Sequence, residues 1–545
     1  MKELRAALRN SSIRRVVVAF ATFNFAEWAT WTAVLVYAFQ RGGATESGLV
    51  AFTMVAPAAV VAPIVASYGG RLRRERQLLL GYVVQAVVMT AGAIAFAAAA
   101  PPLLIYGLAT LTSISVTLTR PAHGSILPSL AATTDELTAA NVASGTVQNV
   151  SIAIAPFAAG LLYADSGPGT VFAVCAAGVA IGAGLVVGVR TVADAPDEAP
   201  NAGAGAEPPP VEAEGNPLDG LRYLGGARGP RLVVALIGAA ALIEGALDVL
   251  MIVVAIDLIG GGPTQAGALS SAAGVGGILG AAAAVALVGR ARLAGPLALG
   301  LVVWGAPVAI LGVVPGFVIA LAVFLVAGVG RGELDVAGRT LLQRVTPDPA
   351  LPGVFGMLEG TYMGMIAIGS IAVPLIIVFL GAHAALVVVG LWLPLVVVVS
   401  WRSLRDVDAA AVVHVRELER LRAIPMFAPL APPTIERLAA NLVPVEAAAG
   451  AWLVREGERG DRFYVVDDGE VEIEIDGRTV RREGPGSSFG EIALLRDVPR
   501  TASVRAVTDV RLLALERDVF LSAVTGHVRS RSVADAVVAE RMGSG

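Results

Sequence analysis

The stretch VVVAFATFNFAEWATWTAVLVYAF, residues 16–39, decides the fold class of this chain. Glu27 is its one charged residue, and a membrane-spanning helix needs about 20 mostly apolar residues. The apolar core of a cleavable signal peptide is shorter, about 7–15 residues. Basic residues precede the stretch at Lys2, Arg5, Arg9, Arg14 and Arg15. The stretch therefore predicts a first transmembrane helix, not a cleavable signal.

The composition extends this conclusion to most of the chain. Of the 545 residues, 56% are hydrophobic and 15% are charged, whereas a soluble domain carries about 25% charged residues. The net charge of −4 gives no reason to expect nucleic acid as a partner. Cys175 is the only cysteine, which excludes an internal disulfide and a thiolate metal cluster. We therefore expect a membrane protein without a metal cofactor.

Twelve stretches are long and apolar enough to cross a bilayer. They are residues 15–38, 45–69, 78–100, 102–127, 138–163, 168–190, 231–257, 264–288, 294–314, 316–343, 353–380 and 383–401. Between the sixth and the seventh lies a polar, proline-rich segment, residues 194–216, which can neither span a bilayer nor pack a core. We expect a six-helix half at 1–190, a cytoplasmic linker at 191–230 and a second six-helix half at 231–405.

Charges in the predicted loops indicate the orientation of the spans. Arginines follow the second, eighth and twelfth spans and the end of the tenth, whereas the opposite loops carry Arg41 and little else that is basic. These arginines are Arg71, Arg73, Arg74, Arg76, Arg290, Arg292, Arg339, Arg344, Arg402 and Arg405. The positive-inside rule then predicts that both termini and the linker are cytoplasmic, in a multi-pass protein of the plasma membrane.

The two predicted halves repeat a pattern of marker residues. The separations between successive markers are 23, 49 and 8 residues in both halves. The markers are Gly48, Arg71, Arg120 and Pro128 in the first half and Gly267, Arg290, Arg339 and Pro347 in the second. Parallel six-span repeats with a substrate bound between them are typical of major facilitator transporters, which this pattern resembles.

Three motifs resemble the drug- and siderophore-exporter branch of that superfamily. Residues 120–128, RPAHGSILP, followed by AAN at 139–141, are similar to the branch's pattern around the fourth span. Residues 155–160, APFAAG, resemble a weakened glycine–proline motif of proton-coupled exporters. Residues 69–74, GGRLRR, resemble the conformational-latch motif, with Gly70 where the family has an aspartate. The resemblance implies an exporter, and Gly70 implies a weaker latch.

Ionisable residues inside the predicted spans are functional candidates, because burying them in a bilayer is costly. Glu244 and Asp248 lie one turn apart in the seventh span, and two adjacent carboxylates in a low dielectric favour holding a proton. Alternatively, Arg331, Asp335 and Arg339 of the tenth span form only a self-neutralising ladder. The candidates for substrate or proton transport are Glu27, Arg120, Glu244, Asp248, Glu333, Asp335 and Glu359.

A separate domain is expected at residues 406–545, where charged residues become frequent and no further span follows. Residues 462–466 and 470–475 alternate apolar and polar side chains, which predicts β-strands, and the Asp-Gly pairs at 468–469 and 476–477 predict turns. The expected helices are residues 413–423, 434–441 and 517–541.

Two motifs in this domain carry its ligand chemistry. They are FGEIALL at 489–495 and PRTASV at 499–504. With the upstream run at 456–471, they closely resemble the β-roll and phosphate-binding cassette of cyclic-nucleotide-binding domains, over about residues 415–545. The resemblance implies a β-roll with flanking helices and cAMP or cGMP as regulatory ligand. The implied ligand residues are Phe489, Gly490, Glu491, Ile492, Ala493, Arg500, Thr501 and Ala502.

These residue types suit a compact anion. Gly490 lets the backbone approach the phosphate, and the helix that opens after it presents unpaired N–H groups. Arg500 can donate paired, charge-assisted hydrogen bonds to phosphate oxygens. The resemblance assigns the ribose 2′-hydroxyl to Glu491 and a guanine amino group to Thr501. In the alternative, Arg500 and Glu491 form only a structural ion pair on a β-roll that has lost its ligand. The residues expected to form a lid over the base are Val533, Val537 and Arg541. The alternative is that they only pack within the domain.

The combined prediction is an α-helical membrane protein with the twelve-helix major facilitator fold, joined to a cytoplasmic β-roll. The sequence contains no G-x-x-x-x-G-K-S/T loop, so transport would be secondary and no enzyme is expected. We expect a proton-coupled exporter of an unknown small molecule, regulated by cAMP in preference to cGMP. A homodimer through the C-terminal domain is kept open. The alternatives are a membrane-anchored nucleotide receptor that transports nothing and a lipid flippase or scramblase.

Overall fold

The computed structural model describes residues 10–69, 73–131, 134–189, 217–284, 292–347, 350–410, 415–430 and 432–543. The chain forms two compact units, residues 1–411 and 412–545, and each is considered by itself. Most of the predicted linker lies outside the described residues, as do Arg71 and Arg290 of the repeat pattern.

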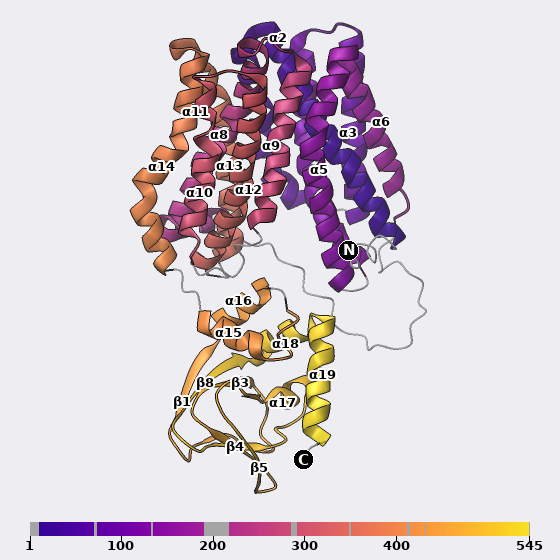
Figure 1. The fold of residues 1–545 in the computed structure, drawn as a ribbon. Helices are drawn as coiled ribbons and strands as arrows, with labels where there is room; N and C mark the ends of the chain where they lie inside the picture. Colours follow the sequence, from indigo (N-terminus) through magenta and orange to yellow (C-terminus); the bar gives the residue numbers. More distant parts are fainter. Residues whose placement is uncertain are drawn as a thin grey trace. The chain divides into compact units, whose positions relative to one another are not determined.

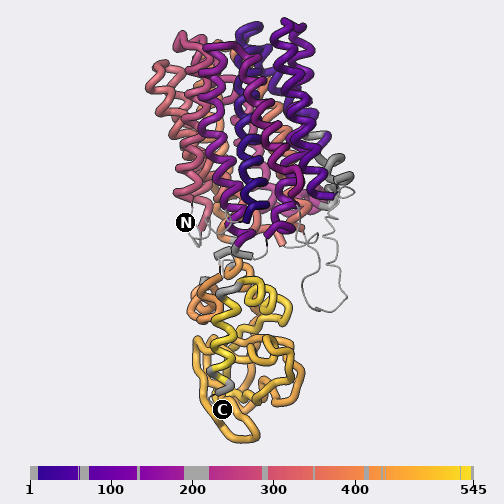
Figure 2. Tube along the Cα trace, turned by 90° about the vertical axis from the view of Figure 1, so that its right-hand side faces the viewer, coloured from indigo at the N-terminus to yellow at the C-terminus, as the bar shows by residue number. Residues whose placement is uncertain are grey.

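The first unit is helical, and its helices run roughly alongside one another (Figures 1 and 2). Of the described helices, ten are long and apolar enough to cross a membrane. The elements are α2 (Ser11–Gly69), α3 (Arg74–Ala97), α4 (Pro102–Leu130), α5 (Thr134–Ser166), α6 (Pro168–Val186), α7 (Pro217–Gly226), α8 (Arg228–Val253), η2 (Val254–Leu258), α9 (Pro263–Ala284), α10 (Ala294–Gly305), α11 (Val308–Leu311), α12 (Phe317–Val345), α13 (Leu351–Leu380) and α14 (Ala382–Ala410).

Helix α2 contains the stretches predicted as the first two spans. Its backbone leaves the helical conformation at Gly42 and Gly43, and Gly43 has a φ of 63°, a value that glycine adopts readily. The break separates residues 15–38 from residues 45–69. The number of twelve spans and the two-repeat layout stay predictions.

Two of the repeat markers occupy matching positions where helices of the two predicted halves meet. A Cβ atom on Gly48 of α2 would lie 2.2 Å from the carbonyl oxygen of Ser370 in α13. A Cβ atom on Gly267 of α9 would lie 2.2 Å from the carbonyl oxygen of Pro156 in α5. Glycine permits this close approach, because it has no side chain to keep the two backbones apart. In a bilayer the hydrophobic effect does not drive helices together, so close van der Waals packing of this kind stabilises their association.

The second unit contains two four-stranded antiparallel sheets with the strand orders β1-β8-β3-β6 and β2-β7-β4-β5 (Figure 1). Val466, Leu512 and Phe489 belong to one apolar core, and the rings of Phe427, Phe463 and Phe520 to another. The elements are α15 (Val415–Ala423), α16 (Pro432–Ala440), β1 (Val443–Ala447), β2 (Trp452–Val454), β3 (Arg462–Asp468), β4 (Val471–Ile475), β5 (Arg478–Glu483), β6 (Ser488–Phe489), α17 (Glu491–Arg496), β7 (Ser503–Ala506), β8 (Val510–Glu516), α18 (Arg517–Thr525) and α19 (Val528–Gly543).

The prediction of one continuous helix at residues 517–541 is wrong. The chain forms α18 and α19 with a break at Gly526. The Gly526 N–H donates to the Ser522 carbonyl at 3.2 Å, which closes α18, and the His527 Nδ1 accepts from the Ser530 N–H at the start of α19. The strands predicted at 462–466 and 470–475 are confirmed as β3 and β4.

Candidate functional site

Arg500 is a buried cation at the centre of the candidate ligand site. It lies between α17 and β7, and 5% of its surface is exposed. Its Nη1 donates to the Gly490 carbonyl at 3.1 Å, and its Nη2 donates to the Arg462 carbonyl at 2.8 Å. Nη2 also contacts Oδ1 of Asp461 at 3.3 Å, although the Asp461 side chain is 69% exposed. These contacts hold the guanidinium against strand β3 and the turn before α17.

Gly490 makes this position of Arg500 sterically possible. Its φ is 96°, a conformation that side chains other than glycine rarely adopt. A Cβ atom here would lie 2.6 Å from Nη1 of Arg500 and 3.0 Å from the Arg462 carbonyl oxygen. The glycine at this position of the motif is therefore required by both backbone conformation and space.

Glu491 places a buried carboxylate next to that cation site. It is the first residue of α17 and is 1% exposed. Its Oε1 accepts a hydrogen bond from Nη1 of Arg541 at 2.6 Å. Its Oε2 is also buried, yet it has no hydrogen-bond partner among the described residues. A buried acceptor without a donor costs about 1–3 kcal/mol, so this oxygen is suited to accept a hydroxyl of a ligand.

The ion pairs differ from the alternative in which Arg500 and Glu491 pair with each other. The acidic partner of Arg500 is Asp461, and the basic partner of Glu491 is Arg541. Both motif residues are thus held by other groups, and one oxygen of Glu491 has no partner in the part of the chain that the structure describes. Sequence reasoning did not identify Asp461, because an exposed aspartate before a strand has no distinguishing pattern.

The remaining motif residues divide between core and surface. Phe489 is buried and stacks on Tyr464 with ring centroids 5.1 Å apart, and burial raises the pKa of the Tyr464 phenol, so this ring stays neutral. Ala493 is buried, Ile492 and Ala502 are half-buried, and Thr501 is exposed.

The expected lid residues lie on α19. Val533 and Val537 are half-buried and pack against the aromatic core, which is the ordinary packing alternative. Arg541 instead reaches the ligand motif, where it bonds Glu491 and also donates to the Ser488 carbonyl at 2.9 Å. Of the three, Arg541 is the one whose hydrogen bonds reach the motif, whereas the two valines pack against the core to which Leu494 belongs.

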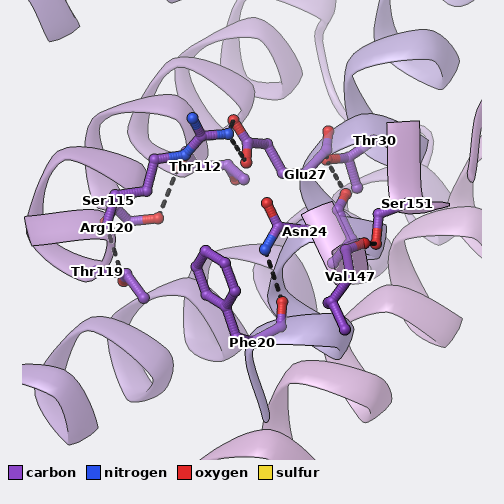
Figure 3. A network of polar contacts seen from close by, with 11 residues as sticks. Phe20, Asn24, Glu27, Thr30, Thr112, Ser115, Thr119, Arg120, Val147 and Ser151 are labelled. Atoms are coloured by element: carbon purple, nitrogen blue, oxygen red, sulfur yellow. Dashed lines mark hydrogen bonds and ion pairs between the residues drawn. The ribbon is translucent and has the colours of Figure 1, made fainter. Parts of the chain in front are cut away.

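A charged pair joins α2 and α4 in the membrane unit. Nη2 of Arg120 donates to Oε1 and Oε2 of Glu27 at 3.0 and 2.8 Å (Figure 3). Asn24, one turn before Glu27, donates from Nδ2 to the Phe20 carbonyl at 2.7 Å, while its oxygen points toward the side of the pair (Figure 3). Three buried polar atoms near this pair have no hydrogen-bond partner in the described parts of the chain: Asn24 Oδ1, Trp28 Nε1 and Arg120 Nε.

A second charged cluster joins α8, α12 and α13. Glu244 accepts hydrogen bonds from Arg331 and from the hydroxyl of Tyr362. Asp248 follows Glu244 one turn later on α8. No local pattern in the sequence identifies Tyr362, because 118 residues separate it from Glu244.

The remaining transport candidates lie on α12 and α13. Arg339 bonds Asp335 at 2.7 Å and Glu359 at 2.9 Å. The predicted self-neutralising ladder of α12 is therefore present only in part. Asp335 pairs with Arg339, whereas Arg331 bonds Glu244 on another helix. Glu333 lies on the same helix α12 and is half-buried.

Comparison with protein families finds two matches that divide the chain as the fold does. The model of the Major Facilitator Superfamily matches residues 16–290. The model of the cyclic nucleotide-binding domain matches residues 444–527, which include the whole motif around Gly490 and Arg500.

Comparison with individual proteins finds relatives of the C-terminal unit. Two proteins named cGMP-dependent protein kinase egl-4, from Caenorhabditis briggsae and Caenorhabditis elegans, are 46% and 45% identical over 76 residues, which cover 14% of this chain and 10% of each kinase. The Thermus thermophilus Catabolite Activator Protein is 31% identical, with 22% of this chain and 58% of that chain covered and a TM-score of 0.20. The regulatory domain of Toxoplasma gondii PKA with cAMP is 26% identical, with coverages of 26% and 56% and a TM-score of 0.22. This chain thus spans about a tenth of the length of the curated kinases that it matches.

Proposed function

Because this chain belongs to the Major Facilitator Superfamily and ends in a cyclic nucleotide-binding domain, we propose that it is a secondary transporter regulated by a cyclic nucleotide. The observation that carries the regulatory part is the pair of a buried Arg500 and a buried Glu491 oxygen without a partner. One group suits an anion, and the other suits a hydroxyl donor.

The proposed ligand is cAMP, with cGMP as the competing nucleotide. Arg500 would neutralise the cyclic phosphate and donate to its exocyclic oxygens. Glu491 Oε2 would accept the ribose 2′-hydroxyl, which supplies the donor that this buried oxygen needs. Thr501 is exposed in the second part of the motif, and its proposed partner is the base of the nucleotide. Guanine carries a 2-amino donor that adenine lacks, so this residue is the proposed discriminator.

The proposed transport step uses the two membrane clusters. Glu27 with Arg120 and Glu244 with Arg331 each join helices distant in sequence, so a change in either pair alters how those helices hold together. Asp248 beside Glu244 gives the second cluster two carboxylates and one arginine, an excess of negative charge suited to taking up a proton. We propose proton-coupled export of a small molecule through this unit.

The proposed orientation has both termini and the nucleotide-binding domain in the cytoplasm. It rests on the arginines of the predicted cytoplasmic loops and on the positive-inside rule. Cyclic nucleotides are made in the cytosol, so this orientation gives the site access to its ligand. The proposed location is the plasma membrane.

The test is proton and substrate flux in proteoliposomes, with nucleotide on the side of the C-terminal domain. Allosteric coupling of roughly 1–3 kcal/mol corresponds to a change of about 5- to 150-fold in rate, of either sign. Arg500→Ala should bind no nucleotide at the same concentration and should show a rate independent of it. If the flux through the wild type does not change with nucleotide, while nucleotide binding is confirmed in the same preparation, the regulatory proposal is contradicted. Absence of any flux would favour a membrane-anchored receptor.

A further inference from the structure

A lateral groove in the membrane unit is lined by α2, α5 and α6. Its volume is about 470 Å³. Thr22 and Phe25 of α2 form part of its lining, Val150 and Ile154 line it from α5, and Val174 and Gly178 from α6. Helix α2 packs against both of the other helices, so it forms the floor between them.

The face of α5 beside the groove carries a stripe of exposed apolar side chains. Val150, Ile154, Phe157 and Leu161 recur every three or four residues and are 44%, 53%, 41% and 47% exposed. This spacing places them on one side of the helix. The side that meets α9 is different, because Pro156 and Gly160 approach that helix. The Phe157 N–H donates to the Ser271 hydroxyl of α9 at 3.0 Å, so the stripe runs beside that helix while its side chains stay exposed. Exposed apolar side chains on a membrane unit suit contact with acyl chains.

The hydroxyl groups of the lining offer no free hydrogen-bond donor. The hydroxyl of Thr22 donates to the Ala19 carbonyl at 2.8 Å, and that of Thr146 donates to the Val142 carbonyl at 2.8 Å. The hydroxyl of Ser151 donates to the Val147 carbonyl at 2.9 Å (Figure 3). Each hydroxyl is therefore satisfied within its own helix. A ligand in the groove would find mostly apolar contacts, and the weak donor that is left in the lining is the Cys175 thiol.

We propose that this groove is a binding site for one acyl chain of a bilayer phospholipid. A volume of about 470 Å³ lies within the range of about 300–1,000 Å³ typical of ligand pockets. The chain binds through van der Waals contact, since an unfilled gap between helices forfeits the dispersion energy of its walls. The remaining chain and the headgroup stay in the bilayer. This site is separate from the charged clusters and does not depend on the proposed transport or its regulation.

The binding of this chain is tested by filling the groove. A Cβ atom on Gly178 would meet its nearest neighbour, Cβ of Thr22, at 4.0 Å, so Gly178→Leu enters the groove without a collision at Cβ. Gly184→Leu is the matched control, because Gly184 lies on the same helix, is exposed, and has no atom within 4 Å of such a Cβ. Ile154→Trp fills the groove from α5, and Leu161→Trp on the same stripe is its control.

The full-length protein is reconstituted in phosphatidylglycerol and phosphatidylcholine vesicles that contain a phospholipid with a diazirine in its acyl chain. After illumination, mass spectrometry locates the crosslinks, and native mass spectrometry of the detergent-purified protein identifies retained lipid. We expect crosslinks on the groove-lining residues and a retained phospholipid mass in the wild type, Gly184→Leu and Leu161→Trp. Both should fall at least tenfold in Gly178→Leu and Ile154→Trp.

Three outcomes would overturn the proposal. One is equal crosslinking and lipid retention in the filled variants, which must elute as the wild type does and keep its thermal stability. Another is a retained mass that matches a free fatty acid or detergent. The third is a protein dimer that dissociates on filling the groove, which would make a second copy its occupant.

Discussion

Arg541 near the end of α19 donates a hydrogen bond to Glu491 at the start of α17, with 2.6 Å between Nη1 and Oε1. This contact attaches the last helix to the ligand motif across 50 residues of sequence. It occupies one oxygen of Glu491 and leaves the other without a partner among the described residues. The last helix therefore holds the same carboxylate that we propose as the acceptor of the ligand's hydroxyl.

Arg541→Ala should destabilise the C-terminal unit by about 3 kcal/mol, because breaking a buried pair leaves an uncompensated charge. The Glu491 side chain that remains is 1% exposed. Thermal or urea unfolding of residues 410–545, a unit with its own cores, measures the effect. Arg531→Ala, at an exposed position of the same helix, is the control and should change stability by less than about 0.5 kcal/mol. Equal stabilities of the two variants would show that the pair contributes nothing.

Arg500→Ala should weaken cAMP binding by about 2–5 kcal/mol, as expected when one partner of a buried charge pair is removed. Calorimetry measures the affinity, and Arg496→Ala, whose side chain is 51% exposed in the same motif, provides the control. Arg500 also bonds two backbone carbonyls, so the circular dichroism of the variant must match the wild type. An unchanged affinity would remove Arg500 from the ligand site.

Glu491→Ala should weaken cAMP binding less than Arg500→Ala, because it removes an acceptor from a neutral hydroxyl and not a counter-charge for the phosphate. For 2′-deoxy-cAMP the difference between wild type and Glu491→Ala should largely disappear. The four affinities form a double-mutant cycle by calorimetry. Additive losses, with no coupling between the residue and the 2′-hydroxyl, would contradict this contact.

Thr501→Ala should reduce the affinity for cGMP more than that for cAMP, because guanine carries a 2-amino donor at a position where adenine has none. Thr501 is exposed, so its truncation should not disturb the fold. Competition of both nucleotides against a fluorescent cAMP analogue measures the ratio. Equal losses for the two nucleotides would show that the threonine does not read the base.

Asp408→Ala should destabilise the membrane unit by about 1–2 kcal/mol, because Asp408 acts on α10 as an N-cap does. Its carboxylate accepts from the Leu293 N–H at 2.9 Å and from the Ala294 N–H at 3.1 Å, and it is 5% exposed. The measurement is thermal unfolding of the full-length protein in detergent, followed by the loss of its monodisperse peak. Asp406→Ala, at an exposed position of α14, should leave the transition unchanged. A similar shift in both variants would refute the capping role.

Local patterns were sufficient to predict most elements and the ligand motif. A span is visible because about 20 apolar residues follow one another, and the motif is visible because its residues from Phe489 to Ala502 are nearly contiguous. The prediction of one helix at 517–541 failed because the break at Gly526 depends on hydrogen bonds that composition does not reveal.

The sequence by itself determined that this chain has spans apolar enough to cross a membrane, that its C-terminal part is a separate β-rich domain, and which short motif has residue types suited to an anion. Each of these properties depends on neighbouring residues. Only the tertiary structure decided that Glu491 pairs with Arg541, that Tyr362 bonds Glu244, that Asp408 caps α10, and that α2, α5 and α6 enclose a groove. These contacts join residues that lie from 50 to 118 positions apart, and in the groove three separate helices. Their distances depend on how the elements pack, which no local pattern encodes.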